Sequence, residues 1–470
     1  MIATGTLGGI TLGGVIPPTS AEAARGDDNR QRRSTMLELN REGDRLRKAG
    51  NLRNALERYN RALAIARQLT NADPNNNEWQ RDLSVSHFKI GQVLRRQGKL
   101  SAALTHFRED LRIAALLSSS DPGNKPWRRD LSISYNKVGD ILREQRKHGA
   151  ALQNYRKSLD IRKELNASDP NNQRWQRDLS LVYFKIGNVL LAQDDTAEAL
   201  RHFQFDLSIS RRLAKANPGN NARQRDFAVS LLKVGDVTRK EGDQAEALRL
   251  YRESLAIREK LNRAKPDNLQ WQRDVSLAHH KIGSLFLDQG NTLKALTHFR
   301  TDLNIAKRLA TQQPQNTERQ RDLSISHNTI GDTLIKRQER AEAISHYKKA
   351  LAIRVDLVAR NANNAQWQRD RWLSYWKLAR AGDQPARRWH QALQAMRTME
   401  QRGILRSSDK RFIKIAEREL AKAGGPPAAP ALPAAGQPAR PRVGAGADNA
   451  VWARGNNNLE YSYAGTRPPE

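Results

Sequence analysis

Apolar positions recur along most of the chain at the spacing of one helix face. After Trp79, the positions i, i+4, i+7 and i+11 are occupied by Leu83, His87, Ile90 and Leu94. The next segment carries a similar stripe of Ala103, Phe107, Leu111 and Ala114. The pattern breaks at Gln97-Gly98 and again at Asp121-Pro122, so it predicts two antiparallel helices of roughly 20 residues, each about 30 Å long.

An asparagine stands just before each predicted first helix, at the position of an N-cap. Asn76 lies two residues after Pro74, and an Asn side chain at this position accepts hydrogen bonds from the free N–H groups of the first turn. The same residue recurs at Asn124, Asn172, Asn220, Asn268, Asn316 and Asn364. The sequence therefore predicts one kind of helix start throughout this part of the chain.

The two-helix pattern repeats every 48 residues, and the phrase WQRDLS or a close variant marks each copy, as at Trp79, Trp127 and Trp175. A glycine in the first helix keeps the same spacing at Gly43, Gly91, Gly139, Gly187, Gly235, Gly283 and Gly331, and an eighth unit has Ala379 there. Alanine follows 12 residues after each glycine, and Phe or Tyr follows 16 residues after it. A fixed period of this length indicates an array of stacked repeats rather than one large core.

This spacing of glycine, alanine and aromatic residue resembles the tetratricopeptide repeat, whose period is about 34 residues. The 14 additional residues fall before the first helix and at the end of the second, which lie side by side at the open end of a helical hairpin. We therefore expect two extended helices in each unit. The resemblance covers residues 36–403 and implies an all-α fold, an α-solenoid of eight helix pairs. It also implies that the first helices line a concave face on which a peptide binds.

A longer period of 96 residues is superimposed on the first. The second helix alternates between a YRxSLxIR form, at Tyr155 and Tyr251, and an FxxDLxI form, at Phe107, Phe203 and Phe299. We interpret this alternation as a trace of duplication and, secondarily, as alternating contacts between neighbours.

The repeated phrase has a structural and a functional interpretation. In the structural one, Trp79 covers the open end of the hairpin, and each Arg pairs with an Asp of the next unit, because adjacent residues such as Arg81 and Asp82 do not face each other on one helix. In the functional one, the arginines grip an anionic ligand, and Arg223 and Arg319, which replace Trp, extend the row. The structural interpretation is favoured, since an Asp beside each Arg cancels the charge that a ligand would need.

Composition limits the chemistry. The chain has 470 residues, a formal net charge of +31 and no cysteine, which excludes disulfides, thiolate metal sites and cysteine nucleophiles. The histidines recur because the unit recurs, and neither HExxH nor a phosphate-binding glycine loop occurs. The sequence therefore predicts a protein that is not an enzyme, with no catalytic residues, no cofactor and no metal.

The candidate binding surface consists of three rows on the first helices, one three residues before the glycine, one directly after it and one a turn further. Their side chains vary between units and mix aromatic, amide and charged types, as an extended peptide with apolar anchors requires. We expect these rows to face away from the core, and the alternative is a stripe that is only solvated. The candidate groove residues are Phe88, Gln92, Arg95, Asn136, Asp140, Arg143, Phe184, Asn188, Leu232, Asp236, Arg239, His280, Ser284, Asn328 and Asp332.

The predicted partner is a protein or an extended peptide, and the predicted role is that of an interaction scaffold. The clamp that some tetratricopeptide proteins use for a terminal carboxylate has Lys in the first row, and this chain has none there. Nucleic acid or another polyanion is the alternative partner because the chain is basic. It ranks second because the charge is spread over the units rather than concentrated in one groove. The sequence does not fix the partner's identity or the oligomeric state.

The ends differ from the repeats. Residues 1–23 resemble a signal peptide, with an apolar stretch and Ala21-Glu22-Ala23 as a cleavage pattern but no basic start; the alternative is a disordered leader. Residues 24–35 are predicted to be a linker, residues 404–423 a C-terminal capping helix, and residues 424–470 a disordered tail rich in Pro, Ala and Gly. A cleaved leader implies a periplasmic or secreted protein, and an uncleaved one a cytoplasmic protein. No apolar run reaches the ~20 residues that span a bilayer.

Overall fold

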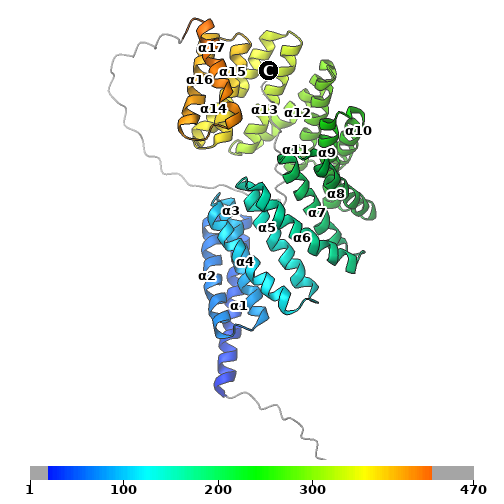
Figure 1. Ribbon diagram of the computed structural model, residues 1–470, viewed down its shortest axis with the longest axis vertical. Helices are drawn as coiled ribbons and strands as arrows, with labels where there is room; N and C mark the ends of the chain where they lie inside the picture. Colours follow the sequence, from blue (N-terminus) through cyan, green and yellow to red (C-terminus); the bar gives the residue numbers. More distant parts are fainter. Residues whose placement is uncertain (1–19, 426–470) are drawn as a thin grey trace, which may run out of the picture. The chain divides into compact units, whose positions relative to one another are not determined.

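The computed structural model describes residues 20–425, and within this range every regular element is a helix (Figure 1). The described chain forms two compact units that divide between Gln193 and Asp194. The first unit contains α1 (Ser20–Lys48), α2 (Leu52–Ala72), α3 (Asn77–Arg96), α4 (Leu100–Ser120), α5 (Lys125–Glu144), α6 (His148–Ser168) and α7 (Gln173–Ala192).

The second unit continues the same alternation of first and second helices and ends with a short cap. It contains α8 (Thr196–Ala216), α9 (Asn221–Glu241), α10 (Gln244–Ala264), α11 (Leu269–Asp288), α12 (Thr292–Gln312), α13 (Thr317–Lys336), α14 (Arg340–Arg360), α15 (Ala365–Arg380), α16 (Pro385–Gln401), a 3-10 turn (Ser407–Asp409) and α17 (Arg411–Lys422). Within each unit, every helix packs against the helix before it and the helix after it. The predicted all-α solenoid of helix pairs is confirmed.

The predicted helix starts are present at each of the seven asparagines. The Asn76 side chain accepts hydrogen bonds from the backbone N–H groups of Glu78 and Trp79, both at 3.1 Å. The six equivalent asparagines also cap their helices. Each cap satisfies donors that the first helical turn leaves free.

The glycine of the first helix makes room for the aromatic ring of the second. A Cβ atom added to Gly43 would lie 2.5 Å from the Tyr59 ring, and one added to Gly331 would lie 2.5 Å from the Tyr347 ring. Ala55, twelve residues after Gly43, is completely buried. Because real Cβ atoms do not approach a ring so closely, glycine is required for the two helices to pack at this distance.

An Arg–Asp ladder joins successive first helices. Within each unit, the arginine of a phrase pairs with the aspartate 49 residues later, on the next first helix, and Arg129–Asp178 and Arg225–Asp274 both measure 2.5 Å. The other pairs of the ladder are Arg33–Asp82, Arg81–Asp130, Arg273–Asp322 and Arg321–Asp370. The structural interpretation of the phrase thus holds for its charged residues. The tryptophans of the phrase are only half-buried.

The C-terminal cap completes the ladder. Arg369 has no further repeat to pair with, and its guanidinium donates to both carboxylate oxygens of Asp409 in the 3-10 turn, at 2.6 and 3.0 Å. Helix α17 then covers the last repeat through Phe412, Ala416 and Leu420. The cap therefore closes both the apolar and the ionic contacts of the stack.

The N-terminal boundary differs from the prediction. Residues 24–35, predicted to be a linker, lie inside α1, which begins at Ser20. Arg33 explains part of this extension, because it starts the ladder by binding Asp82. Of the predicted leader (residues 1–23) and tail (residues 424–470), residues 1–19 and 426–470 lie outside the described residues, while residues 20–23 belong to the start of α1. No helix between residues 20 and 425 is long and apolar enough to span a membrane.

Candidate peptide-binding surface

The first of the three candidate rows is mostly buried, which contradicts the expectation that it faces away from the core. Asn136, Leu232 and Asn328 are at most 7% exposed, and Phe184 and His280 are each 8% exposed. These side chains turn toward the second helix of a repeat, where the Asn136 amide lies against Ser158 and Arg162 of α6. Phe88 is the exception, since it is half-buried while its ring edge packs on Phe107.

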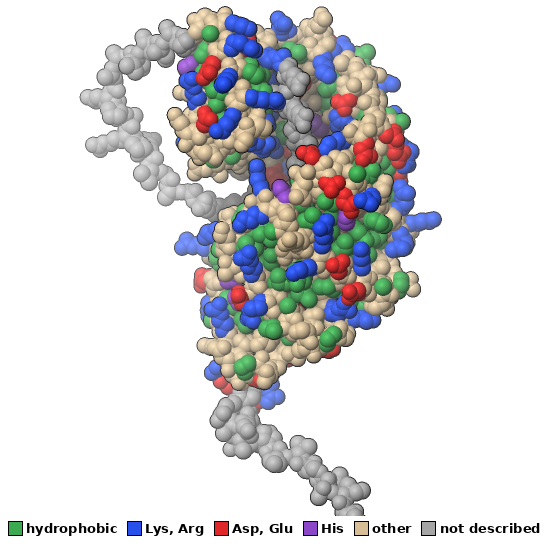
Figure 2. Space-filling view, viewed as in Figure 1, with side chains coloured by type: hydrophobic (Ala, Val, Ile, Leu, Met, Phe, Trp, Pro, Cys, Tyr) green, Lys and Arg blue, Asp and Glu red, His purple; other side chains and the backbone are tan. Residues whose placement is uncertain are grey.

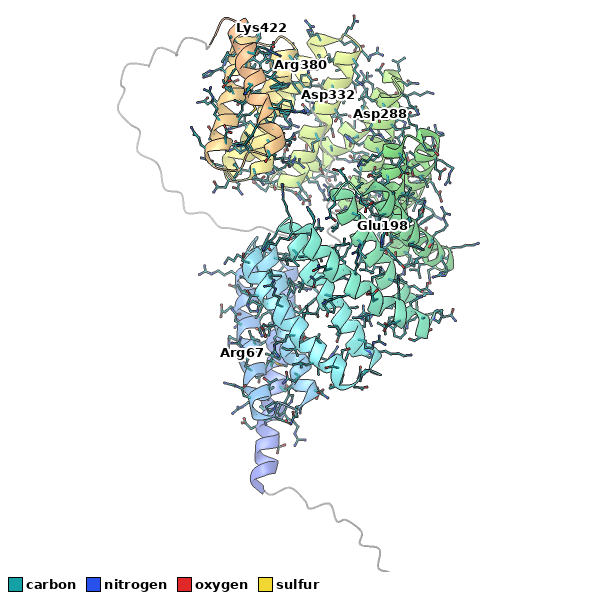
Figure 3. The ribbon with its side chains drawn as sticks, in the orientation of Figure 1. Arg67, Glu198, Asp288, Asp332, Arg380 and Lys422 are labelled. Carbon is teal, nitrogen blue, oxygen red and sulfur yellow. The ribbon has the colours of Figure 1, made fainter. Side chains whose placement is uncertain are left out.

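In every second repeat, the residue after the glycine is an aspartate held by its neighbours. Asp236 accepts a hydrogen bond from the Tyr251 hydroxyl of its own repeat at 2.8 Å and an ion pair from Lys281 of the next repeat at 2.8 Å. Asp332, labelled in Figure 3, is bound in the same way by Tyr347 and Lys377. The other bridges of this kind are Tyr59–Asp44–Lys89 and Tyr155–Asp140–Lys185.

The bridge at Asp236 shifts the pKa values of its carboxyl and its phenol. Burial alone would raise the pKa of Asp236, but the charges of Lys281 and Lys233 outweigh it and lower that pKa below the usual range. Burial and the adjacent carboxylate raise the pKa of Tyr251 well above its ordinary value. Asp236 therefore stays ionised beside a neutral Tyr251 at physiological pH. Asp140, Asp236 and Asp332 thus serve contacts between repeats.

The remaining repeats have a polar, uncharged residue at the same place. The Asn188 side chain donates to the carbonyl of Phe184 at 2.7 Å, and Ser284 donates to the carbonyl of His280 at 2.9 Å. Gln92 is half-exposed and lines a cavity. These three side chains make no ion pair. This part of the row therefore takes the smallest part in contacts between repeats.

The candidate residues of the third row are arginines, and two of them, Arg95 and Arg239, bind the next first helix. Arg95 donates to Glu144 at 2.8 Å and lies 3.8 Å from Asp140. Arg239 donates to Asp288, labelled in Figure 3, at 2.6 Å. Arg143 also has an interaction partner. The structure thus brings the rows together on the first helices, but it engages most of their charges in contacts between repeats.

The second helices carry a buried polar group that the sequence analysis did not single out. In the repeats whose second helix carries the YRxSLxIR form, here called Tyr-type repeats, this group is an arginine. Arg258 is 1% exposed and donates to the carbonyl of Asp274 at 2.8 Å. In the repeats whose second helix carries the FxxDLxI form, here called Phe-type repeats, it is an aspartate. These residues are Asp110, Asp206 and Asp302, each at most 3% exposed. The alternating motifs SLxIR and FxxDL were the available signal, because charged side chains are seldom buried unless they are paired.

A cavity of about 360 Å³ opens on the candidate surface of the first unit. Its wall includes two residues of the predicted rows, Phe88 and Gln92. Trp127 of the repeated phrase and Ile133 of α5 add apolar surface, and Asp110 of α4 adds a carboxylate. This volume lies near the lower end of the range of small-ligand sites, ~300–1,000 Å³.

The histidines form pairs rather than metal clusters in the described part of the chain. The Nδ1 atoms of His87 and His106 lie 3.1 Å apart, and the same contact joins His279 to His298 and His327 to His346. Burial and the second ring lower the pKa of His87 to about 4, so this pair is neutral at pH 7. Within residues 20–425, no group of three or more His, Asp or Glu side chains is arranged to hold a metal ion.

On the face of the described residues that Figure 2 draws, the charges do not gather into one basic patch. Figure 2 shows Lys and Arg side chains spread over the visible face of each unit and interspersed with Asp and Glu. Many of these charges are paired, as in the ladder and the third row.

Comparison with known proteins identifies the repeat. The family model described as tetratricopeptide repeat matches residues 132–171 and 227–263, which cover the α5/α6 and α9/α10 pairs. Two helix pairs of this chain therefore match the tetratricopeptide repeat. No curated protein matches the sequence.

Several solved structures are similar to this chain. BtubC from P. vanneervenii has 17% sequence identity and a TM-score of 0.44, over 56% of this chain and 92% of that one. RapI has 14% identity and a TM-score of 0.48, over 69% and 99%. A tetratricopeptide repeat protein from Parabacteroides merdae has 15% identity and a TM-score of 0.37, over 73% and 99%.

Proposed function

We propose that this protein is a non-enzymatic interaction scaffold that binds an extended peptide segment of a partner protein along its first helices. The observation that carries the proposal is the half-exposed surface at Phe88 and Gln92, which opens into a cavity. An apolar ring beside an amide offers a peptide both a buried anchor and a backbone hydrogen bond. We also propose that residues 1–23 act as a signal peptide that directs export of the protein.

Ion pairs made by the charged residues of the three rows reduce the surface that is open to a peptide. Asp236 and Arg239 are engaged by Lys281 and Asp288, so a peptide that used them would have to displace a contact between repeats. Phe88, Gln92 and Ser284 make no such ion pair. Binding is therefore centred on the Phe-type repeats, where the residue after the glycine is uncharged.

The test is selection of random twelve-residue peptides on the full chain, followed by calorimetry with the selected peptides. The double variant Phe88→Ala, Gln92→Ala is expected to weaken binding by at least about tenfold, because it removes an aromatic anchor. Leu116→Ala is the matched control, since Leu116 is an apolar side chain of α4 that is 55% exposed. It is expected to change the affinity by less than about twofold.

Two outcomes would contradict the proposal. One is that no peptide is selected above background. The other is that the control variant weakens binding as much as the double variant does. Retention of single-stranded DNA or RNA that falls steeply with salt would instead support the alternative of a polyanion-binding protein.

A further inference from the structure

Asp110 differs from its two equivalents in the other Phe-type repeats. Its Oδ1 atom accepts a hydrogen bond from Ser84 at 2.5 Å, but its buried Oδ2 atom has no hydrogen-bond partner among the described residues. At the equivalent positions, Asp206 receives Ser230 at 2.7 Å, and Asp302 receives Ser326 at 2.8 Å and His280 at 3.2 Å. One carboxylate of three is left incompletely bound.

The contact of one serine distinguishes Asp110 from both equivalents. The position of His280 is taken by Phe88 in the Asp110 repeat but also by Phe184 in the Asp206 repeat, and a phenyl ring donates no hydrogen bond, so the histidine sets apart only Asp302. Ser230 and Ser326 each donate both to the buried aspartate and to a backbone carbonyl of their own helix, whereas the equivalent Ser134 donates to the carbonyl of Asp130 at 3.1 Å. The Ser134 hydroxyl still acts on Asp110 as a weak hydrogen-bond donor that lowers the pKa of the carboxyl, but Oδ2 receives no hydrogen bond of normal geometry. A buried carboxylate oxygen without a donor costs free energy that a ligand can recover.

The incompletely bound carboxylate belongs to the wall of the 360 Å³ cavity. The cations of this wall are engaged elsewhere, because Arg81 pairs with Asp130 while Arg47 and Lys89 pair with Asp44. Lys137 of α5 acts on Asp110 only at longer range and has its Nζ 5.7 Å from the centre of the Phe88 ring. Asp110 is thus the carboxylate of this cavity that lacks a cation at ion-pair distance.

The rest of the wall is suited to an aliphatic stem. Phe88 and Trp127 provide aromatic faces, and Val85, Ala114 and Ile133 provide aliphatic surface. Arg and Lys side chains bury their methylene groups along such surfaces and place the charged head against an anion. Burial raises the pKa of Asp110 to about 6, so the carboxylate is largely ionised at pH 7.5.

We propose that this cavity is the anchor pocket for one Arg or Lys side chain of the bound peptide, with the Asp110 carboxylate as its counter-charge. The inference rests on the proposed peptide-binding function and names the residue class that the surface selects. The net charge of +31 does not oppose it, because distant charges are screened within about 8 Å at physiological ionic strength.

The experiment uses the full chain at pH 7.5 and four labelled versions of one selected peptide, in which the anchor residue is Arg, Lys, Gln or Leu. Fluorescence anisotropy is expected to show that Arg and Lys bind at least about tenfold more tightly than Gln and Leu. Asp110→Asn, which keeps the shape of the side chain, is expected to abolish that preference. Asp302→Asn is the matched control and is expected to retain it.

A second variant protects the test against a folding defect in Asp110→Asn. Phe88→His supplies Asp110 with the partner that Asp302 already has, and it is expected to reduce the preference for Arg and Lys to below about threefold. Preference that survives in both variants, or that Asp302→Asn also removes, would overturn the inference. In that case peptide binding itself, and with it the proposed function, would still stand.

A separate probe covers the case in which no peptide is selected. The proposed function then fails, and n-butylguanidinium is titrated alone while the indole N–H signal of Trp127 is followed by nuclear magnetic resonance. The inference predicts a saturable shift of that signal in the wild type and its loss in Asp110→Asn. An unchanged signal in the wild type would overturn the pocket as well.

Discussion

Two surfaces join each first helix to the next one within a unit, and they are built differently. Near the helix start, every described junction carries an Arg–Asp pair, such as Arg225–Asp274. Beyond the glycine, only every second junction carries a Tyr–Asp–Lys bridge, such as Tyr251–Asp236–Lys281. The intervening junctions have an amide or hydroxyl residue in place of the aspartate.

The difference separates the contacts that fix the stacking of the repeats from the junctions where side chains stay accessible to a partner. The ladder gives each junction the same ionic contact, so it helps to fix the 48-residue step. The bridges have a 96-residue period, which matches the alternation of Tyr and Phe in the second helices. Where the bridge is missing, Gln92 is half-exposed and the cavity opens beside it.

The largest loss of stability is expected from a variant at the C-terminal end of the Arg–Asp ladder. Arg369→Met leaves Asp409, 2% exposed, without its only bidentate partner. Removal of one member of a buried ion pair costs about 3–5 kcal/mol. The free energy of unfolding of the second unit, followed by urea denaturation and circular dichroism, is expected to fall by that amount.

The double variant Arg369→Met, Asp409→Asn is the control, because it removes both charges together. It is expected to recover more than half of the loss. Equal losses in the single and double variants would show that the cap depends on apolar packing and not on the end of the ladder.

The next test concerns the packing that both repeat types share. Gly139→Ala would place a Cβ atom 2.7 Å from the Tyr155 ring, and overpacking of this kind costs about 1–3 kcal/mol. Gly149→Ala at the start of α6 is the control, since a Cβ atom there meets nothing within 4 Å. It is expected to leave stability unchanged or to raise it by up to about 1 kcal/mol. A stable Gly139→Ala protein would show that the helices can move apart at little cost.

The features that sequence could predict are those that recur with the unit. The N-cap at Asn76, the contact of Gly91 with Phe107 and the ladder pair Arg81–Asp130 all follow from a fixed spacing along the chain. Their spatial partners lie one helix or one repeat away. A periodic pattern therefore specifies them almost completely.

The burial of the first row was not predictable from one helical face. A first helix inside the stack packs against its own second helix and against helices of both neighbouring repeats, so Leu232 and Asn328 lie inside although they stand off the main apolar stripe. The free oxygen of Asp110 was also not predictable, because it depends on how closely the Ser134 hydroxyl approaches the carboxylate, and a serine stands at that position in all three repeats. Such features arise from side-chain geometry rather than from the repeat pattern.

The smallest effect is expected at the Tyr–Asp–Lys bridge, which occurs in every second repeat. Tyr251→Phe removes the hydroxyl that donates to Asp236 at 2.8 Å, and the expected loss in the free energy of unfolding is about 1 kcal/mol, the usual contribution of such a bond. Lys281→Met acts on the same carboxylate. The two losses should therefore not add, with a coupling energy of at least about 0.5 kcal/mol in a double-mutant cycle measured by urea denaturation.

Tyr135→Phe serves as the control for this cycle, because the Tyr135 hydroxyl makes no hydrogen bond within residues 20–425. It is expected to change stability by less than about 0.5 kcal/mol. Additive losses at Tyr251 and Lys281 would mean that the aspartate is bound by two independent contacts. The 96-residue period would then reflect duplication alone, and the comparison between bridged and unbridged junctions would lose its energetic basis.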